Sequence, residues 1–325
     1  MYHFIIKFIL SNSPLRTQRS FDNEFRIEVL HLKIYGFERN DTLLNIKAEF
    51  HCHTTSSDGK MSPTEVVQRA SIKGIQFLAI TDHDNTEGIE AAIEASKTYG
   101  INIIPGIELS CNHNKESVHV LGYFRDASYK DESLQKFLRN LKNSRVERAK
   151  SIVDKLKTYF DIELDYEKVL AKGEGVVARP HIAQSIIDAG YDYSWEYIFD
   201  KIIGNDCPAY VPNKIITVEE GVALLKKYNA VVVLAHPVLL KKNTPEDLIK
   251  FGFDGLEAIY FMNFKKDEDR LISLCRNKSL LFTCGSDFHG ITEGDNKHGD
   301  IGDMSIDTAD FNNFMNSYNK DYCIY

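Results

Sequence analysis

From residue 45 onward, short apolar runs alternate with amphipathic stretches. The apolar runs predict β-strands at 45–53, 77–81, 101–110, 118–124, 231–237, 255–260 and 280–290. Amphipathic stretches predict helices at 63–73 and 86–99. Strands that alternate with helices in this way are typical of an α/β fold built on a largely parallel sheet.

Two of the predicted helices carry recognisable boundary signals. Ser62 precedes Pro63, and Glu65 stands where it can close a capping box with Ser62. Gly74 and Gly100 follow the last periodic residues, where a left-handed conformation is accessible to glycine. The sequence therefore places helix starts directly after the polar ends of strands.

The alternation of apolar runs and amphipathic stretches is interrupted between about residues 126 and 212. One long helix is predicted over 132–159, and a shorter one over 181–190. The sequence thus predicts an N-terminal extension (1–46) with short strands around Phe25–Tyr35, an α/β region in two parts (47–125 and 213–325), and a helical insertion (126–212) between them.

Composition narrows the class of protein. Charged residues make up 26% of the 325 residues and no apolar run reaches 18, which excludes a disordered chain and a membrane-spanning helix. A net charge of −8 argues against coating long duplex nucleic acid, but not against a small phosphorylated substrate, because bound metal ions would reverse the local charge. Six cysteines without a CxxC pair favour a reducing compartment, and a cytoplasmic location is expected.

Histidines and acids gather at the predicted strand ends. His51 and His53 are two residues apart, so a strand places both imidazoles on one face and Cys52 on the other. The same spacing recurs at Asp287 and His289. The full set of candidate ligands is His51, His53, Asp58, His83, Glu108, His119, His236, Asp287 and His289. Mixed imidazole and carboxylate donors suit zinc, manganese or iron, and they predict a multinuclear metal site.

Four of the other five histidines, His3, His31, His113 and His298, fit no such pattern. Asp82 and Asp84 flank His83, and either could orient a ligand histidine or simply hold a loop. Both interpretations are open from the sequence.

Six separated motifs resemble those of the PHP (polymerase and histidinol phosphatase) family of metal-dependent phosphoesterases. They are HCHTTSSDG, TDHD, PGIE, VHVLGY, LAHP and GSDFHG, and the resemblance extends from about residue 47 to residue 302. It is greatest to the stand-alone phosphoesterases that act on nucleoside 3′,5′-bisphosphates and on short RNA 5′ ends. Those relatives also carry an R-x-x-R-A segment and an R-x-H segment, which appear here at 145–149 and 179–181.

The resemblance implies a distorted (β/α)7 TIM-like barrel with its site at the carboxyl ends of the strands. It also implies two to three divalent ions, most often Mn²⁺, with Zn²⁺, Fe²⁺ or Mg²⁺ as alternatives. One ion would be held by His51, His53, Glu108 and Asp287. A second would share Glu108 with His119 and His236, and a third would take Asp58, His83 and His289.

The activity implied is hydrolysis of a phosphate ester. Divalent ions neutralise the phosphate oxygens and lower the pKa of a bridging water from about 15.7 towards about 7, so that the resulting hydroxide attacks phosphorus. Histidinol-phosphate phosphatase is a second interpretation, and a non-catalytic polymerase-associated module is a third. The R-x-x-R-A and R-x-H segments favour the first activity, and the short chain with all nine ligands disfavours the third.

The insertion is the predicted place of substrate contact, through Arg145, Arg148, Arg179 and His181, because guanidinium groups bind phosphate in bidentate fashion. Residues 136–157 hold eight bases against two acids, which fits either a phosphate-facing helix or an ordinary solvated face. Tyr210, Tyr260 and Phe261 would either stack on a base or lie in the core. The segment after Tyr260 lacks the His-Pro that many relatives show there.

The expected partner is a small nucleotide or short oligoribonucleotide, with neither a membrane nor a long duplex involved. The same metal core serves a 3′-phosphatase and a 5′-to-3′ exonuclease, so both activities are open, and nothing in the sequence indicates the oligomeric state.

Overall fold

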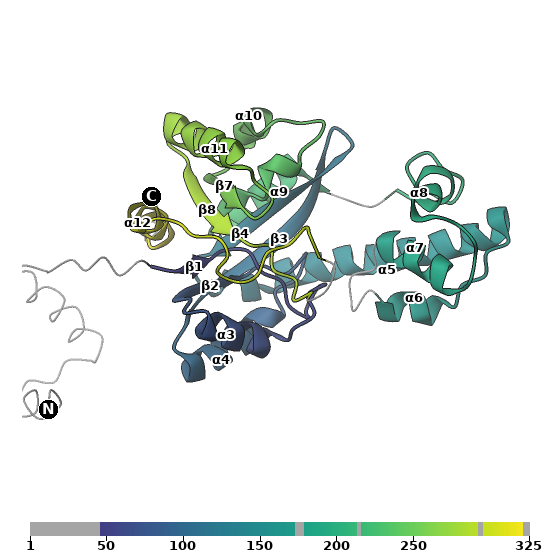
Figure 1. Cartoon of the computed structure of the whole chain (residues 1–325), viewed down its shortest axis with the longest axis horizontal. Helices are drawn as coiled ribbons and strands as arrows, with labels where there is room; N and C mark the ends of the chain where they lie inside the picture. Colours follow the sequence, from purple (N-terminus) through teal and green to yellow (C-terminus); the bar gives the residue numbers. More distant parts are fainter. Residues whose placement is uncertain (1–45, 173–178, 213–215, 292–294, 321–325) are drawn as a thin grey trace, which may run out of the picture. The chain divides into compact units, whose positions relative to one another are not determined.

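The computed structural model describes residues 46–172, 179–212, 216–291 and 295–320 (Figure 1). The predicted N-terminal extension with its strands lies outside these ranges, apart from residue 46, and so do His3 and His31. The strands are β1 (Ala48–Glu49), β2 (Phe77–Ile80), β3 (Asn102–His113), β4 (Glu116–Phe124), β5 (Ile216–Thr217), β6 (Ala230–Leu234), β7 (Gly255–Tyr260) and β8 (Leu281–Gly285).

The described helices follow the strands or fill the insertion. The α-helices are α3 (Pro63–Ile72), α4 (Gly88–Tyr99), α5 (Glu132–Phe160), α6 (Tyr166–Lys172), α7 (Arg179–Asp188), α8 (Trp195–Tyr197), α9 (Val218–Lys227), α10 (Pro245–Leu248), α11 (Lys265–Lys278) and α12 (Thr308–Tyr318). Short 3-10 segments are η1 (Ala127–Lys130), η3 (Pro237–Leu239) and η4 (Ile249–Phe251), and η2 (Ile198–Ile202) is a π-helical segment.

The sheet is a nearly closed barrel. Its strands follow the order β1-β2-β3-β4-β6-β7-β8, and β5 pairs with β3 beside this path. The Phe50 amide donates to the Cys284 carbonyl at 3.2 Å, and Cys52 forms a parallel bridge with Phe288, so β8 and its continuation return to β1. The predicted distorted (β/α)7 barrel is confirmed.

The distortion comes from β4, which runs antiparallel to both of its neighbours, β3 and β6. The expectation that residues 118–124 form a hairpin partner is confirmed, whereas the alternative of an edge strand is wrong. Because β4 is reversed, its beginning lies at the edge where the parallel strands end, and His119 faces Ser110 of β3 in the register. A histidine near the start of a strand thereby joins residues at the ends of others.

Several predicted strands are shorter or longer than expected. The run 45–53 yields only β1, and 280–290 yields only β8, because the chain beyond each leaves the ladder and turns histidines and acids towards one another. Conversely, β3 continues to His113 because it pairs with β4 over its whole second half. The capping box of Ser62 and Glu65 is confirmed, and Gly74 and Gly100 adopt φ of 74° and 69°.

The described residues form two hydrophobic cores. The first fills the barrel and its helices, and it includes Leu134 and Leu138 from the first half of α5. The second is built from α5 to η2, and it includes Ile152 and Leu156 from the second half of α5. A separate core is what an inserted module requires, and the boundaries at residues 126 and 212 remain a prediction.

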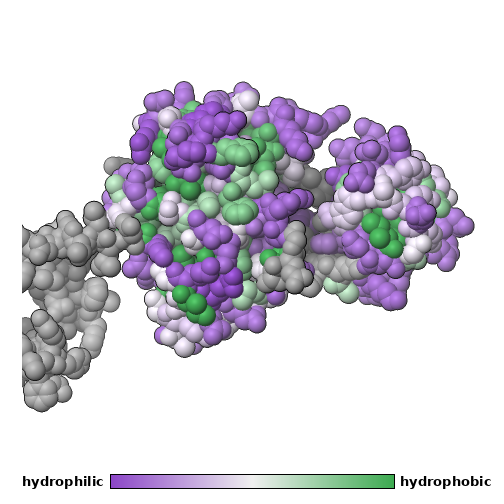
Figure 2. All heavy atoms as spheres, viewed as in Figure 1, coloured by the Kyte–Doolittle hydropathy of each residue, from purple (hydrophilic) through white to green (hydrophobic). Residues whose placement is uncertain are grey.

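Among the described residues, none of the helices combines the length and the apolar composition needed to cross a bilayer. Figure 2 shows a face on which hydrophilic residues predominate, with hydrophobic residues between them.

Candidate metal centre

The nine candidate ligands come together at one edge of the barrel. His51 and His53 follow β1, Asp58 lies in the next loop, and His83 follows β2. Glu108 lies within β3 and His119 within β4, while His236, Asp287 and His289 follow β6 and β8. Cys52 points the other way and donates its thiol hydrogen to the Ala79 carbonyl, as the alternation of a strand predicted.

The first group surrounds His51 and His53. The Nε2 atoms of His51 and His53 lie 3.2 and 3.1 Å from Asp287 Oδ1. The same two nitrogens lie 3.4 and 3.3 Å from Glu108 Oε2, and 3.2 Å from each other. All four side chains are buried. This is the set that the resemblance to the PHP family implies for one metal ion.

The second group meets at the other oxygen of Glu108. His119 Nδ1 lies 2.9 Å and His236 Nε2 3.0 Å from Glu108 Oε1. His83 also joins Glu108, because its Nδ1 is 2.8 Å from Oε2. Glu108 therefore contacts members of all three predicted ligand sets.

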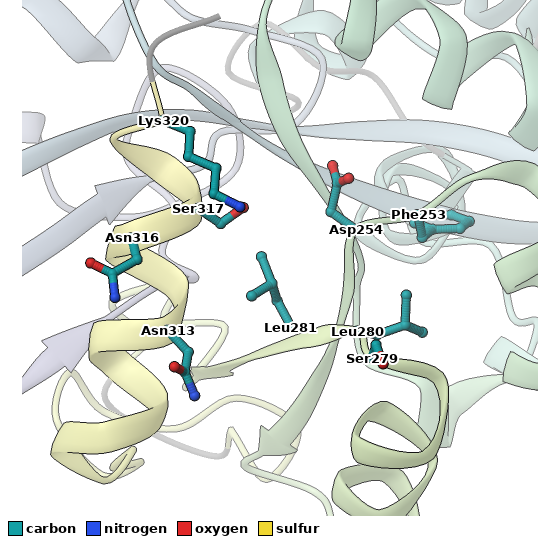
Figure 3. A pocket seen from close by; sticks show the side chains of 9 residues that line it. All are labelled: Phe253, Asp254, Ser279, Leu280, Leu281, Asn313, Asn316, Ser317 and Lys320. Carbon is teal, nitrogen blue, oxygen red and sulfur yellow. The ribbon is translucent and has the colours of Figure 1, made fainter.

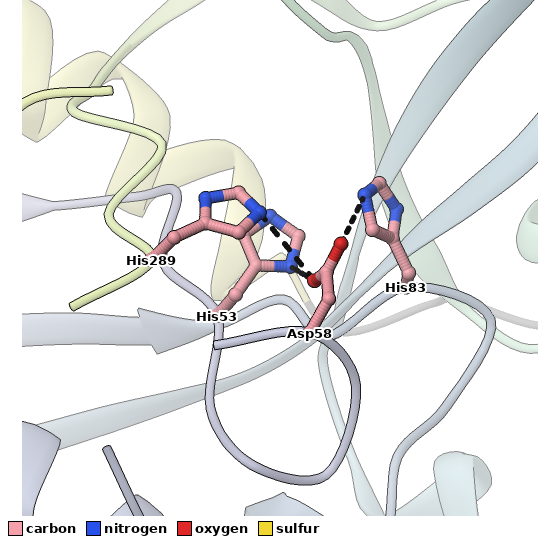
Figure 4. Close-up of side chains that lie close together, drawn as sticks. All are labelled: His53, Asp58, His83 and His289. Atoms are coloured by element: carbon pink, nitrogen blue, oxygen red, sulfur yellow. Dashed lines mark ion pairs between the residues drawn. The ribbon is translucent and has the colours of Figure 1, made fainter. Parts of the chain in front are cut away.

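The third group is centred on Asp58 (Figure 4). Its Oδ1 lies 3.5 Å from His53 Nδ1 and 3.4 Å from His289 Nε2, and its Oδ2 lies 3.7 Å from His83 Nε2. The predicted third set lacked His53, whose two ring nitrogens face different groups. His53 is thus a candidate bridge between the first and third positions.

The donor atoms fit a metal. Asp58 Oδ1, His83 Nδ1 and Glu108 Oε2 are buried and form no hydrogen bond, although His83 Nδ1 and Glu108 Oε2 are only 2.8 Å apart. Buried polar atoms normally have a hydrogen-bond partner, and exceptions call for an explanation. A cation would explain these exceptions, because the cluster holds three groups of three or four donor atoms, each group within 4.8 Å, that could bind a metal ion.

The charges in the cluster perturb its pKa values. Burial alone would lower the pKa of His51, but Glu257, Asp287 and Glu108 raise it well above its usual value. Burial would also lower the pKa of His53, but the nearby carboxylates of Asp287, Glu108 and Asp58 raise it to about 10. For Glu108, burial is outweighed by the charges of His83, His119 and His51, which hold its pKa well below the usual range. Protons therefore compete with cations for these donors.

The described hydrogen bonds of the two acids that flank His83 go to backbone amides, hydroxyls and Arg145, which supports the interpretation that these acids hold loops. Asp82 accepts hydrogen bonds from the Thr54 amide, the Thr54 hydroxyl and the Ser57 hydroxyl, and thereby holds the loop after β1. Asp84 accepts the Ser110 amide and pairs with Arg145. An aspartate two to four residues beyond a strand can accept a hydrogen bond from a backbone amide as readily as from an imidazole.

Two side chains of β7 contact the cluster, although the sequence assigned neither of them to it. Glu257 Oε1 lies 2.9 Å from His51 Nδ1, and the Tyr260 hydroxyl donates to Asp287 Oδ2 at 3.1 Å. Tyr260 is buried, which supports the core alternative rather than base stacking. The only sequence signal was the position of Glu257 in an apolar strand, where an unpartnered carboxylate would be costly.

His298 also lies beside the cluster, although it fitted no pattern. Its ring centroid is 4.1 Å from that of His289, and its Nδ1 is 2.8 Å from Asp295 Oδ2. His113 lies elsewhere, with its ring against Phe251.

The predicted substrate residues lie in the insertion. Arg145 forms an ion pair with Asp84, and Arg148 donates from Nε to the Val211 carbonyl at 2.7 Å. Arg179 donates to Asn205 and lies 5.8 Å from the centre of the Tyr210 ring. Burial, followed by the charges of Arg179 and Arg145, lowers the pKa of Arg148 to about 10. His181 is half-buried in the first turn of α7.

Some of the eight bases of α5 are engaged within the protein. Lys150 pairs with Glu147 and Lys157 with Glu163, while Lys155 donates to the Tyr210 carbonyl. Part of the basic stretch is therefore an ordinary charged surface, as one of the two interpretations held. Phe261 is half-buried close to Gly299.

A cavity of about 580 Å³ lies apart from this cluster (Figure 3). It is lined by α12, the start of β8 and the residues just before β7 and β8, and none of the nine candidate ligands lines it. Asp254 and Lys320 are its charged lining residues.

An α/β barrel whose strand ends converge on histidines and carboxylates is the architecture of a metal-dependent hydrolase. Comparison with known proteins specifies the class further. Residues 49–198 match the PHP domain model. A 5′-3′ exoribonuclease of Haemophilus influenzae is 31% identical over 250 residues, which cover 75% of this chain and 90% of the relative.

Two further similarities agree. A 3′,5′-nucleoside bisphosphate phosphatase of Chromobacterium violaceum is 27% identical over 79% of this chain and 92% of its own length. A crystal structure from Bifidobacterium adolescentis, described as a metal-dependent phosphoesterase, superposes with a TM-score of 0.69 at 29% identity, covering 85% of this chain and 98% of that one.

The chain belongs to the PHP family, and it is a metal-dependent hydrolase of phosphoester bonds. The alternative of a non-catalytic polymerase module is not favoured, because these relatives match over nearly their whole length and are phosphoesterases. Histidinol-phosphate phosphatase is likewise not favoured.

Proposed function

We propose that the protein hydrolyses phosphate esters of nucleoside 3′,5′-bisphosphates or of the 5′ ends of short RNAs. Two relatives that match over about nine-tenths of their own length bear the names of these activities. Both names describe enzymes that act on phosphate esters of nucleotides, so one class of small phosphorylated substrate is common to them. The separate core supports the assignment of an inserted module, and we propose that this module, at 126–212, contacts the substrate.

We assign the nine residues to two or three divalent ions. His51, His53, Glu108 and Asp287 would hold one, Glu108, His119 and His236 a second, and Asp58, His83 and His289 a third, with His53 and His83 placed to be shared. Mn²⁺ is the proposed occupant, since imidazole and carboxylate donors together suit it better than Mg²⁺. When bound, these ions supply Lewis-acid chemistry at the phosphate and lower the pKa of coordinated water.

The observation that carries the substrate assignment is the grouping of three arginines. Arg148 is half-buried, and burial lowers its pKa, with a further lowering from the nearby charges of Arg179 and Arg145. Like charges gathered in a partly desolvated place are unfavourable until an anion binds among them. Arg145 also reaches Asp84, the neighbour of His83, so this grouping begins beside the metal ligands.

In this assignment the residues of the insertion and of the loop after β2 have different roles in substrate binding. Arg145, Arg148, Arg179 and His181 bind and orient the substrate phosphates, because guanidinium and imidazole groups donate hydrogen bonds to phosphate oxygens. Asp84 holds Arg145 through its carboxylate. A cytoplasmic location is proposed as well, because all five described cysteines are free thiols.

The test is release of phosphate and of nucleotide from 3′-phosphoadenosine 5′-phosphate and from a 5′-phosphorylated RNA trinucleotide, each with Mn²⁺ and with chelator. His83→Ala removes a proposed ligand, whereas His113→Ala removes a histidine outside the cluster and serves as the matched control. We expect Mn²⁺-dependent turnover in the wild type and in His113→Ala, and its loss in His83→Ala.

The better substrate separates phosphatase from exonuclease. Cleavage of histidinol phosphate with neither nucleotide substrate turned over would overturn the substrate assignment. Wild-type turnover by His83→Ala would overturn the metal assignment.

A further inference from the structure

Strand β7 supplies none of the nine candidate ligands, yet two of its residues contact three of them. Glu257 meets His51 and His236, and Tyr260 meets Asp287. Both side chains are buried. A carboxylate and a phenol placed so deeply in an apolar strand need a compensating role, because burying them costs free energy unless they are bonded.

The contact with His51 selects one form of its ring. Glu257 Oε1 lies 2.9 Å from Nδ1, and the carboxylate accepts, so Nδ1 carries the hydrogen. In the neutral ring the lone pair is then on Nε2, which lies 3.2 Å from Asp287 Oδ1 and 3.4 Å from Glu108 Oε2. The side chain of Glu257 thereby directs the donor atom of His51 into the first group.

The second oxygen of the same carboxylate acts on another ligand. Glu257 Oε2 accepts the backbone amide of His236 at 2.7 Å. His236 has φ of 28° and ψ of 62°, in the left-handed region that is unfavourable for a residue with a Cβ. The carboxylate bond compensates for this backbone conformation, which turns the His236 ring towards Glu108, 3.0 Å away.

The neighbouring strand leaves room for this carboxylate. A Cβ added at Gly285 of β8 would overlap Glu257 Oε1 and would lie 2.5 Å from the Cβ of His51. The absence of a side chain at this position is therefore a geometric requirement of the contact between Glu257 and His51.

Tyr260 completes the arrangement. Its hydroxyl donates to Asp287 Oδ2 at 3.1 Å, while Asp287 Oδ1 faces His51 and His53. One oxygen of Asp287 is thus occupied, and the other remains directed into the first group.

We propose that Glu257 and Tyr260 are positioning residues that preset His51, His236 and Asp287 for metal binding, an inference that rests on the metal assignment of the proposed function. Neither residue is a metal ligand itself. Two side chains of β7 that contact candidate ligands then explain how His51, His236 and Asp287, which follow three different strands, acquire a common geometry.

The test compares Mn²⁺ binding to chelator-treated protein by isothermal titration calorimetry. Glu257→Gln keeps the size of the side chain but satisfies at most one of its two donors. Its matched control is Asp254→Asn, directly before the same strand, where the carboxylate accepts the Val232 amide at 2.8 Å and pairs with Lys226. Both variants lose a carboxylate that joins β7 to β6, but only one of the two faces the ligands.

We expect Glu257→Gln to weaken Mn²⁺ binding about 10- to 100-fold, the usual effect of removing a partner of a metal ligand. Asp254→Asn is expected to bind as the wild type does, even where its melting temperature falls. Tyr260→Phe removes one hydroxyl and is expected to weaken binding by a smaller factor, and it tests the same arrangement if Glu257→Gln does not fold.

His51→Ala distinguishes the positioning role of Glu257 and Tyr260 from the assignment of the metal ligands. Loss of Mn²⁺ binding in His51→Ala together with wild-type affinity in Glu257→Gln and Tyr260→Phe would overturn the positioning role and leave the metal assignment standing. Wild-type affinity in His51→Ala would overturn the assignment itself, and the positioning role with it.

Discussion

Arg145 and Asp84 form an ion pair that joins the middle of α5 to the loop after β2. The other oxygen of Asp84 accepts the Ser110 amide at 2.8 Å, so the carboxylate is fixed from the barrel side. Asp84 directly follows His83, a candidate metal ligand. The pair therefore connects an arginine of the insertion with the metal cluster.

Asp84→Ala should weaken substrate binding. Without its partner, Arg145 is free to adopt many side-chain conformations, and a charge-assisted hydrogen bond is worth roughly 1.5–3 kcal/mol. We expect KM for the phosphate substrate to rise about 10-fold or more, with a smaller change in kcat. Steady-state kinetics beside Glu94→Ala, which breaks an exposed pair with Lys97 on α4, check this. An unchanged KM would contradict it.

Arg148→Ala should separate substrate binding from metal binding. Arg148 lies beside Arg179 and Arg145 and has no ligand role, so its loss should raise KM about 10- to 100-fold while Mn²⁺ affinity stays as in the wild type. Lys150→Ala removes a more exposed base of the same helix and is the control. A parallel loss of Mn²⁺ affinity would show that the arginine acts on the metal site.

Removal of the metal should destabilise the protein as well as inactivate it. Ligand binding stabilises the folded state by about 2.7 kcal/mol at a ligand concentration 100 times Kd. Thermal denaturation should therefore show a higher midpoint with added Mn²⁺ than with chelator. Glu108→Gln, which alters the side chain shared by the groups, should abolish this difference. A Mn²⁺-dependent midpoint that persists in that variant would place the ion elsewhere.

Glu49 should make stability fall as pH rises. Burial raises its pKa from 4.5 to about 7, and the amides of Ser286, Gly302 and His51 offset this only partly. Between these two values the folded chain binds more protons than the unfolded one, so folding is favoured at the acid end and loses about 3 kcal/mol by neutral pH.

Glu49→Gln isolates this effect from the other titrating groups. The difference in unfolding free energy, variant minus wild type, should grow by about 3 kcal/mol between pH 4.5 and 7.5 in metal-free protein. Urea denaturation at several pH values measures it. A difference that stays constant with pH would show that folding does not raise the pKa of Glu49.

Phe314 of α12 should matter for stability but not for the site. It is buried, with its ring 4.6 Å from Phe50 and 5.4 Å from Tyr123, so Phe314→Ala should cost about 3–5 kcal/mol. Phe264→Ala, at a residue 72% exposed, is the control and should change little. Equal stability of the two variants in urea would mean that α12 does not pack on the barrel.

Much of the fold was predictable because its signals are local. The alternation of apolar runs and amphipathic helices, the capping box at Ser62 and the left-handed glycines depend on neighbours in sequence, and all of them are confirmed. Strand ends were less accurate. Whether residues beyond Glu49 continue a ladder depends on the strand that lies beside them, which the local pattern does not contain.

The sequence by itself determined which residues gather, because parallel strands place their carboxyl ends at one edge and the histidines and acids stand at those ends. Only the tertiary structure decided how they are used. In the structure β4 is antiparallel, so His119 reaches the cluster from near the start of a strand. Asp84 pairs with Arg145 rather than with a histidine, and Glu257 contacts His51, which lies 206 residues away in the sequence. Hydrogen-bond partners so far apart in the sequence are brought together by the packing of the barrel, and the spacing of residues along the chain does not predict them.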